Sequence, residues 1–142
     1  VQQLGRSPAR IVLHGPSLGS FVALSVAQRR ETAAVVLENP VTNVAELVEG
    51  WVPWFLDPLV RFDVDPARTR PDNVPPMTAP GPPVLIFGGE ADPIAPAWMA
   101  RRLAEVAPEG RARLVEIAGG GHNDLPSSPG FIPAYAALVD QI

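Results

Sequence analysis

One serine of this chain stands between two glycines, directly after a short apolar run. Residues 11–20 read IVLHGPSLGS. A Gly-x-Ser-x-Gly sequence between a strand and a helix forms a strained turn that lifts a serine hydroxyl clear of a sheet. We expect a left-handed backbone at Ser17, with Gly15 and Gly19 leaving room for the strand and the helix to meet. The pattern predicts Ser17 as a nucleophile.

Attack by a serine hydroxyl on a carbonyl group places negative charge on the carbonyl oxygen. The backbone N–H of Leu18, which follows Ser17, is expected to donate to this oxyanion at the N-terminus of the predicted helix. The alternative is that residues 15–19 form only a tight turn, with an anion held at the helix N-terminus.

A serine nucleophile needs a general base, and the chain contains two histidines, His14 and His122. His14 ends the first apolar run, just before the glycine. His122 lies in the sequence Gly-Gly-Gly-His-Asn-Asp, directly after the last predicted strand. Parallel sheets place their ligands at the carboxyl ends of strands. We therefore expect His122 to be the base and His14 to be structural.

The base needs a carboxylate that orients its ring. We favour Asp92, which follows the third predicted strand. Glu38, after the second strand, is the main alternative, and Glu90 is a further one. Asp124 is close to His122 in sequence, and we expect it to cap the loop.

Four apolar runs are predicted to be strands: Arg10–His14, Ala33–Leu37, Val84–Phe87 and Arg113–Ala118. The first three are continuously apolar, as expected of strands covered by helices on both faces of a parallel sheet. The last alternates between apolar and polar residues, which suits a strand near the sheet edge.

Helical patterns separate and follow these runs: Ser20–Arg30, Asn43–Gly50, Ala97–Val106 and Pro133–Ile142. The first is apolar on most sides and is expected to be well buried. The third is predicted to place Trp98, Met99, Leu103 and Val106 on one stripe, and the fourth Tyr135, Leu138, Val139 and Ile142. Alternation of strands and helices predicts an α/β fold with a parallel sheet.

Residues 51–83 do not fit the regular pattern, because they are rich in proline and carry two tryptophans. Prolines at this density interrupt both helices and strands. We predict a Pro/Trp-rich excursion above the sheet, within a single domain that comprises residues 1–142.

Composition narrows the class of protein. The chain has 142 residues, a net charge of −4 and no cysteine. The acidic balance argues against a nucleic-acid partner, and the lack of cysteine excludes disulfides and thiolate sites. No apolar run approaches the roughly 20 residues that span a bilayer, so we do not expect a membrane partner. We expect a cytoplasmic location. We expect no metal and no cofactor, because the two histidines lack a paired-ligand spacing and no glycine-rich nucleotide motif is present.

Four segments together resemble the C-terminal half of an α/β-hydrolase: IVLHGPSLGS, AAVVLENPVTNVAEL, PPVLIFGGEADPIAP and EIAGGGHNDLP. The chain order of Ser17, Asp92 and His122 is the order of that family. The Gly-His-Asn-Asp motif and the Leu-Glu-Asn-Pro strand end look most like its serine-aminopeptidase-like and depalmitoylase-like branch.

The resemblance implies a serine hydrolase that cleaves ester, thioester or amide bonds of a small-molecule, acyl or peptidyl substrate through an acyl-enzyme. In this family the excursion usually roofs the site. Trp51, Trp54, Phe55 and Leu56 would then line an acyl pocket or pack under a loop.

The sequence departs from the family pattern in two ways. Pro16 precedes the nucleophile, where a polar or aromatic residue is common, but the oxyanion donor comes after Ser17. The family's elbow strand is the fifth of eight, whereas here it is the first, so we expect strands five to eight only. The second oxyanion donor would then be missing, which typically lowers the rate by about 10²–10³-fold.

An elbow strand without its usual neighbour would present an open edge, through which self-association is expected. The alternative function is a truncated or degenerate hydrolase that acts as a non-catalytic binding module.

Overall fold

The computed structural model describes residues 7–50 and 71–142. Four strands form one parallel sheet in the order β1-β2-β3-β4: β1 (Val12–Pro16), β2 (Ala34–Glu38), β3 (Val84–Gly89) and β4 (Ala112–Ile117). This arrangement confirms the predicted partial α/β-hydrolase sheet of four parallel strands.

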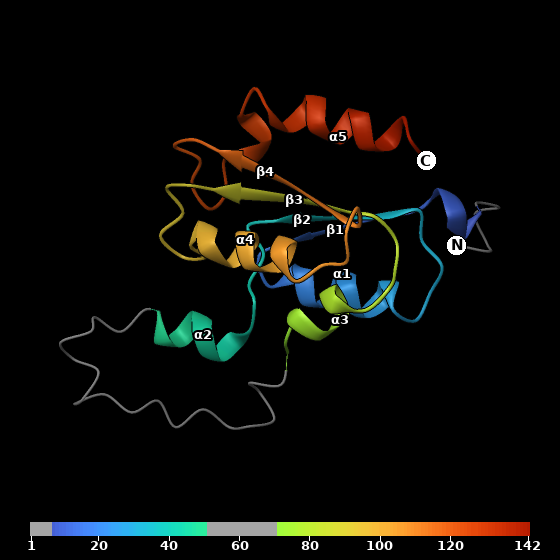
Figure 1. Ribbon diagram of the computed structural model, residues 1–142. Helices are drawn as coiled ribbons and strands as arrows, with labels where there is room; N and C mark the ends of the chain where they lie inside the picture. Colours follow the sequence, from blue (N-terminus) through green and yellow to red (C-terminus); the bar gives the residue numbers. More distant parts are fainter. Residues whose placement is uncertain (1–6, 51–70) are drawn as a thin grey trace.

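Helices cover both faces of this sheet (Figure 1). The helices are α1 (Gly19–Ala27), α2 (Val44–Glu49), α3 (Val74–Thr78), α4 (Ala97–Glu105) and α5 (Phe131–Val139). Figure 1 shows α1, α3 and α4 on one face and α5 on the other. Two short 3-10 turns, Pro8–Arg10 and Leu125–Ser127, precede β1 and α5. Among the described residues no helix has the length and apolar content that crossing a membrane requires.

The core forms two layers because side chains alternate along each strand. On β2, Val35 and Leu37 pack with Leu24 and Leu103 beneath α1 and α4. Val36 faces the other way and packs in the layer beneath α5. Every residue of β2 and β3 is buried, which explains their continuous apolar runs.

The outer strands differ from the two inner ones. Among the described residues β1 pairs with β2 alone, and it is only partly buried. β4 forms the other edge, with Arg113 and Glu116 exposed. The alternating pattern of the last strand therefore indicated its edge position correctly.

Two predictions of helix burial are wrong. In α1 only Ser20, Ala23 and Leu24 are buried, and Val22 is 65% exposed. In α4 Trp98 is 41% exposed, although it was expected on the buried stripe. Each helix packs only one face against the sheet, so an apolar residue outside that face remains exposed to solvent.

The C-terminal helix also differs from its prediction. It begins at Phe131, before Pro133, and buries Phe131, Ala134 and Leu138. Val139 and Ile142 were expected on the apolar stripe, but both are exposed.

The described end of the proline-rich excursion, residues 71–83, contains a helix that its composition did not predict. Pro75 stands in the first turn of α3, where a missing N–H disrupts no helical hydrogen bond. The Arg111 guanidinium donates to the carbonyl oxygens of Pro76, Met77 and Ala79, and burial lowers the pKa of Arg111. The four aromatic and aliphatic residues proposed for an acyl pocket, Trp51, Trp54, Phe55 and Leu56, lie outside the described residues.

Candidate active site

The strained turn predicted at Ser17 is present. Ser17 lies between β1 and α1 with φ of +50°, a conformation that non-glycine residues rarely adopt. Its N–H donates to the Glu38 carbonyl oxygen at 2.8 Å, at the end of β2. A side chain at Gly15 would place its Cβ 2.6 Å from the Gly19 oxygen and 2.8 Å from Ala23 Cβ. The close approach of strand and helix therefore requires a glycine at position 15.

A buried polar chain supports the turn from the helix side. Ser20 Oγ donates to the Ser17 carbonyl oxygen at 2.6 Å. The Asn73 side-chain amide donates to Ser20 Oγ at 2.8 Å and to the Val41 carbonyl oxygen at 2.7 Å. Ser20 and Asn73 are both almost fully buried. These bonds join the turn to the segment that leads into α3.

Leu18 follows Ser17 and is the N-cap residue of α1. Its side chain is exposed. Among residues 7–50 and 71–142 no hydrogen bond of the Leu18 N–H is found. The first N–H groups of a helix carry partial positive charge and lack intrahelical partners.

Asp92 and His122 form the pair expected from the sequence. Asp92 Oδ2 lies 2.7 Å from His122 Nδ1. The other carboxylate oxygen accepts from the N–H groups of Ile94 and Ala95 at 2.7 and 3.0 Å. The Asp92 side chain is fully buried and that of His122 is 13% exposed. A carboxylate oxygen at this distance can accept from a protonated Nδ1, which would direct Nε2 away from Asp92.

The alternative carboxylates are directed elsewhere. Glu38 Oε2 accepts from His14 Nε2 at 3.1 Å, so this glutamate pairs with the other histidine. Glu90 is exposed. Asp124 Oδ1 accepts from the Gly121 N–H at 2.7 Å and caps the loop, as predicted.

The His14 ring lies beside two aromatic rings of α5. Besides Glu38, its ring contacts the rings of Phe131 and Tyr135, with centroids 6.3 and 5.9 Å away. In the described part of the chain, no three His, Cys, Asp or Glu side chains gather in a way that would hold a metal ion.

Glycines allow the acid loop and the histidine loop to touch. A Cβ at Gly89 would collide with the backbone of Gly120 and Gly121. The N–H groups of Glu90 and Ala91 donate to Ile117 and Gly120 at 3.1 and 2.9 Å. This contact brings the loop after β3 against the loop after β4.

Sequence reasoning assigned no role to Asn39, which the structure places at the centre of the site. Its side-chain amide donates to the carbonyl oxygens of Gly121 and His122 at 2.9 and 3.0 Å. Its side-chain oxygen accepts from the Gly89 N–H at 2.8 Å. An asparagine before a proline at a strand end was the available signal, since asparagine tolerates a left-handed backbone.

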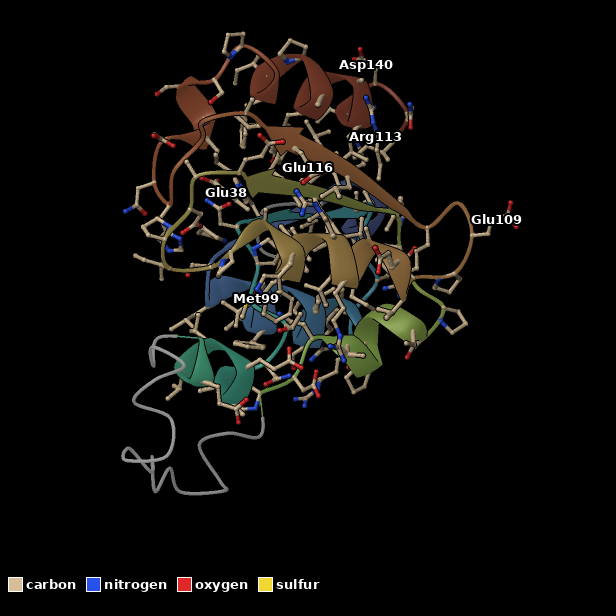
Figure 2. All side chains as sticks on the ribbon, turned by 60° about the vertical axis from the view of Figure 1, so that its left-hand side comes forward. Glu38, Met99, Glu109, Arg113, Glu116 and Asp140 are labelled. Carbon is tan, nitrogen blue, oxygen red and sulfur yellow. The ribbon has the colours of Figure 1, made fainter. Side chains whose placement is uncertain are left out.

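Ser17, Asp92 and His122 follow three different strands, all at the carboxyl end of the sheet. Figure 2 shows Glu38 near this end and Glu109 at the other. Within the described ranges no hydrogen bond joins the Ser17 and His122 side chains, so their connection runs through the backbone at the end of β2.

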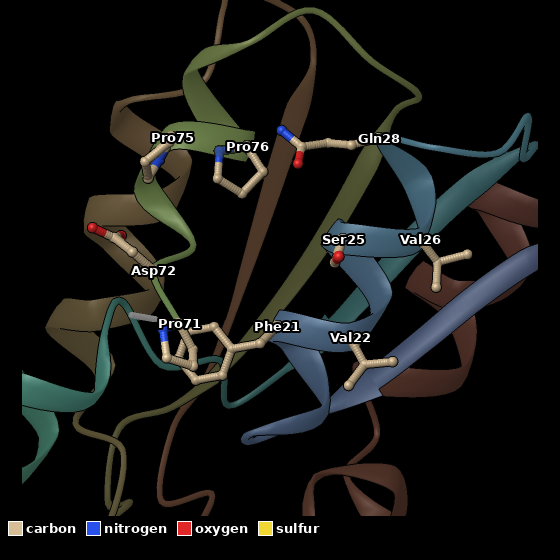
Figure 3. A pocket seen from close by; sticks show the side chains of 9 residues that line it. All are labelled: Phe21, Val22, Ser25, Val26, Gln28, Pro71, Asp72, Pro75 and Pro76. Carbon is tan, nitrogen blue, oxygen red and sulfur yellow. The ribbon is translucent and has the colours of Figure 1, made fainter. Parts of the chain in front are cut away.

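A groove of about 570 Å³ runs between α1 and residues 71–76 (Figure 3). Its lining residues are Phe21, Val22, Ser25, Val26, Gln28, Pro71, Asp72, Pro75 and Pro76. None of the three candidate catalytic residues lines it, so this groove is separate from the site.

Comparison with known proteins agrees with this arrangement. Residues 61–135, more than half of the chain, match the model of a family described as TAP-like protein. The chain belongs to the α/β-hydrolase superfamily.

Relatives of this α/β-hydrolase chain occur in bacteria and animals. The uncharacterized protein Rv2307c of Mycobacterium tuberculosis is 40% identical over 119 residues, which cover 82% of this chain and 39% of that protein. Human alpha/beta hydrolase domain-containing protein 17C is 32% identical over 124 residues, which cover 85% of this chain and 33% of that protein. The α/β-hydrolase chain thus spans about two fifths or less of these curated relatives.

Among solved structures, the apo form of Thermogutta terrifontis esterase 2 is 25% identical with a TM-score of 0.60. The match covers 97% of this α/β-hydrolase chain and 55% of that one.

Proposed function

We propose that this chain carries the catalytic centre of a serine hydrolase that cleaves ester, thioester or amide bonds through an acyl-enzyme. Ser17 is the nucleophile, His122 the general base and Asp92 the carboxylate that orients the base. The observation that carries the proposal is the 2.7 Å hydrogen bond between His122 Nδ1 and the buried Asp92 carboxylate.

The hydrogen bonds of the acid–base pair support this assignment of roles. Two backbone N–H groups hold the Asp92 carboxylate, and the carboxylate holds the His122 ring with its proton on Nδ1. His122 Nε2 then takes the proton from Ser17 Oγ during attack. The imidazolium that forms is stabilised by Asp92, which stays ionised throughout.

The covalent steps follow from these roles. Ser17 Oγ bonds to the substrate carbonyl carbon while its proton passes to His122, and the carbonyl electron pair moves to oxygen. When the tetrahedral intermediate collapses, the leaving alcohol, thiol or amine takes the proton from His122, and the acyl group stays on Ser17. Water then attacks the acyl-enzyme while its proton passes to His122, the bond between the acyl carbon and Ser17 Oγ breaks, and Ser17 Oγ takes the proton from His122 as a carboxylic acid is released.

The Leu18 N–H is the oxyanion donor in this proposal. It lies directly after the nucleophile and at the N-terminus of α1, where the helix dipole favours negative charge. The similarity to an esterase supports an ester among the three substrate bonds.

A fluorophosphonate probe tests the proposal, because it labels an activated serine without requiring the natural substrate. The 142-residue chain would be treated beside the variants Ser17→Ala and His122→Ala, with folding checked by circular dichroism. Ser25→Ala is the matched serine control, since Ser25 lies on α1 and lines the separate groove.

We expect labelling of the wild-type chain and of Ser25→Ala, and none of the other two variants. A folded wild-type chain that takes no label would overturn the proposal and favour the non-catalytic binding module. Label that persists in Ser17→Ala would overturn the assignment of the nucleophile.

A further inference from the structure

We propose that Asn39 is the positioning residue that brings His122 back across the sheet toward Ser17. The inference rests on the proposed function, because it explains how the base reaches the nucleophile. Asn39 itself is 2% exposed, and its side chain bonds to backbone groups of two other strand ends.

The strand order creates a distance that the base must cross. Ser17 follows β1 and His122 follows β4, and these are the two edges of the described sheet. Neighbouring strands lie about 4.8 Å apart, so three intervals separate the two strands by roughly 14 Å. A histidine that stayed above its own strand would not reach the serine hydroxyl.

Asn39 shortens this distance at the end of β2, one strand from the nucleophile. Its amide nitrogen uses both hydrogens on the histidine loop, donating to the Gly121 and His122 carbonyl oxygens. These bonds hold the histidine loop at the end of β2, which lies two strands away from β4 in the sheet. The base is therefore fixed through the backbone of its own residue.

The same side chain also holds the acid strand. Asn39 Oδ1 accepts from the Gly89 N–H at 2.8 Å, and the Asn39 N–H donates to the Phe87 carbonyl oxygen at 2.9 Å. Since Asp92 follows β3 directly, one side chain sets the relative position of the two loops that carry the acid and the base.

Consecutive residues at this strand end hold both partners of the proton transfer. The Glu38 carbonyl oxygen accepts from the Ser17 N–H, and the next side chain, Asn39, donates to His122. The path from nucleophile to base thus passes through the peptide unit that joins Glu38, the last residue of β2, to Asn39.

The backbone at Asn39 is in a left-handed conformation, with φ of +43°. Glycine would adopt this conformation but offers no side chain, and aspartate would adopt it but has no N–H donors. Asparagine adopts the left-handed conformation, donates the two hydrogen bonds to the histidine loop and accepts the hydrogen bond from Gly89. A left-handed, fully bonded residue at a functional site indicates that the surrounding structure depends on its geometry.

The test compares Asn39→Asp and Asn39→Gly with wild type in the 142-residue chain. Asp keeps the shape and the acceptor for Gly89 but loses the donors to the histidine loop. Gly keeps the backbone conformation and loses every side-chain bond. Asn43→Asp is the matched control, since it makes the same change in the N-cap residue of α2, whose side-chain oxygen accepts from the Glu46 N–H and whose amide makes no side-chain hydrogen bond within the described residues.

Two readouts are measured per folded molecule. The first is the fluorophosphonate labelling rate, which should fall by roughly 10- to 100-fold in both Asn39 variants because the base is displaced. The second is the ¹H–¹⁵N correlation spectrum of the histidine rings. The His122 signals should shift in both variants, whereas the His14 signals and all signals of Asn43→Asp should stay unchanged.

Unchanged His122 signals in a folded Asn39 variant would overturn the proposal, whether or not the labelling rate falls. If Asn39→Asp does not fold, Asn39→Gly decides, and failure of both to fold would show a role in folding instead of positioning. An unlabelled wild-type chain would overturn the proposed function alone, since the ring signals report the position of His122 without catalysis.

Discussion

The acid–base half of the candidate site and its nucleophile half are held together in different ways. Asp92, His122 and Asn39 are joined by individual side-chain hydrogen bonds at the carboxyl end of the sheet, where Asp92 and Asn39 are buried. Ser17 stands at the end of the edge strand β1, and the turn around it is fixed mainly by backbone contacts and by the close approach at Gly15.

This difference determines which substitutions each half tolerates. In the acid–base half one side-chain atom often carries one essential contact, so an isosteric change should abolish function without changing the fold. In the nucleophile half several backbone contacts share the task, so the same kind of change should mostly affect stability. The two halves should therefore separate in experiments that measure activity and stability side by side.

The largest effect is expected for Asp92→Asn. The amide side chain would retain the shape but could donate to His122 Nδ1, which favours the tautomer that protonates Nε2. That tautomer takes no proton from Ser17. The fluorophosphonate labelling rate should fall by roughly 10³- to 10⁴-fold.

Asp124→Asn is the control for this change, because its side-chain oxygen can still accept from the Gly121 N–H. Its labelling rate should remain close to wild type. If the labelling rate fell equally in both variants, the loss of either negative charge would explain the effect. Asp92 would then have no specific role in orienting His122.

An intermediate effect is expected for Gly15→Ala, which breaks the nucleophile half at its tightest contact. The new Cβ would press on the Gly19 oxygen and on Ala23, so strand and helix must move apart. Overpacking of this kind costs about 1–3 kcal/mol of the free energy of unfolding, measured by urea denaturation. The displaced turn should also lower the labelling rate by roughly 10- to 100-fold.

Gly19→Ala is the matched comparison on the other side of the serine. Its Cβ would meet Pro16 Cδ at 3.2 Å, and alanine favours the helix that begins there. We expect its free energy of unfolding to stay within about 1 kcal/mol of wild type. A larger loss than in Gly15→Ala would contradict the packing argument.

Sequence reasoning paired Asp92 with His122 because each follows a strand at the same end of the sheet, and the structure joins the two side chains by a hydrogen bond. It placed β2 and β3 well because continuous apolar runs are typical of strands covered on both faces. It overestimated the burial of Val22 and Trp98, because apolar character alone does not show which face of a helix is exposed to solvent. Sequence reasoning used Asn39 only as part of the Leu-Glu-Asn-Pro strand end, because its hydrogen bonds are made with the ends of two strands that lie far away in sequence.

The smallest effect on labelling is expected for Ser20→Ala, which removes two side-chain hydrogen bonds from the nucleophile half: the bond that Ser20 Oγ donates to Ser17 and the bond that it accepts from Asn73. The Ser17 carbonyl oxygen would lose one donor, and Asn73 would keep its bond to the Val41 oxygen. One net hydrogen bond contributes about 1 kcal/mol, so the loss of two should lower the free energy of unfolding by about 2 kcal/mol. The labelling rate should fall less than in Gly15→Ala. The Ser17 N–H still donates to the Glu38 carbonyl oxygen, and Gly15 still allows α1 to approach β1 closely.

Ser25→Ala, on the same helix but outside this chain of bonds, should leave both measurements near wild type. A loss of labelling in Ser20→Ala as large as that in Asp92→Asn would contradict the comparison. The hydroxyl of Ser20 would then hold the nucleophile as strictly as the Asp92 carboxylate holds the base, and the nucleophile half would also depend on individual side-chain bonds.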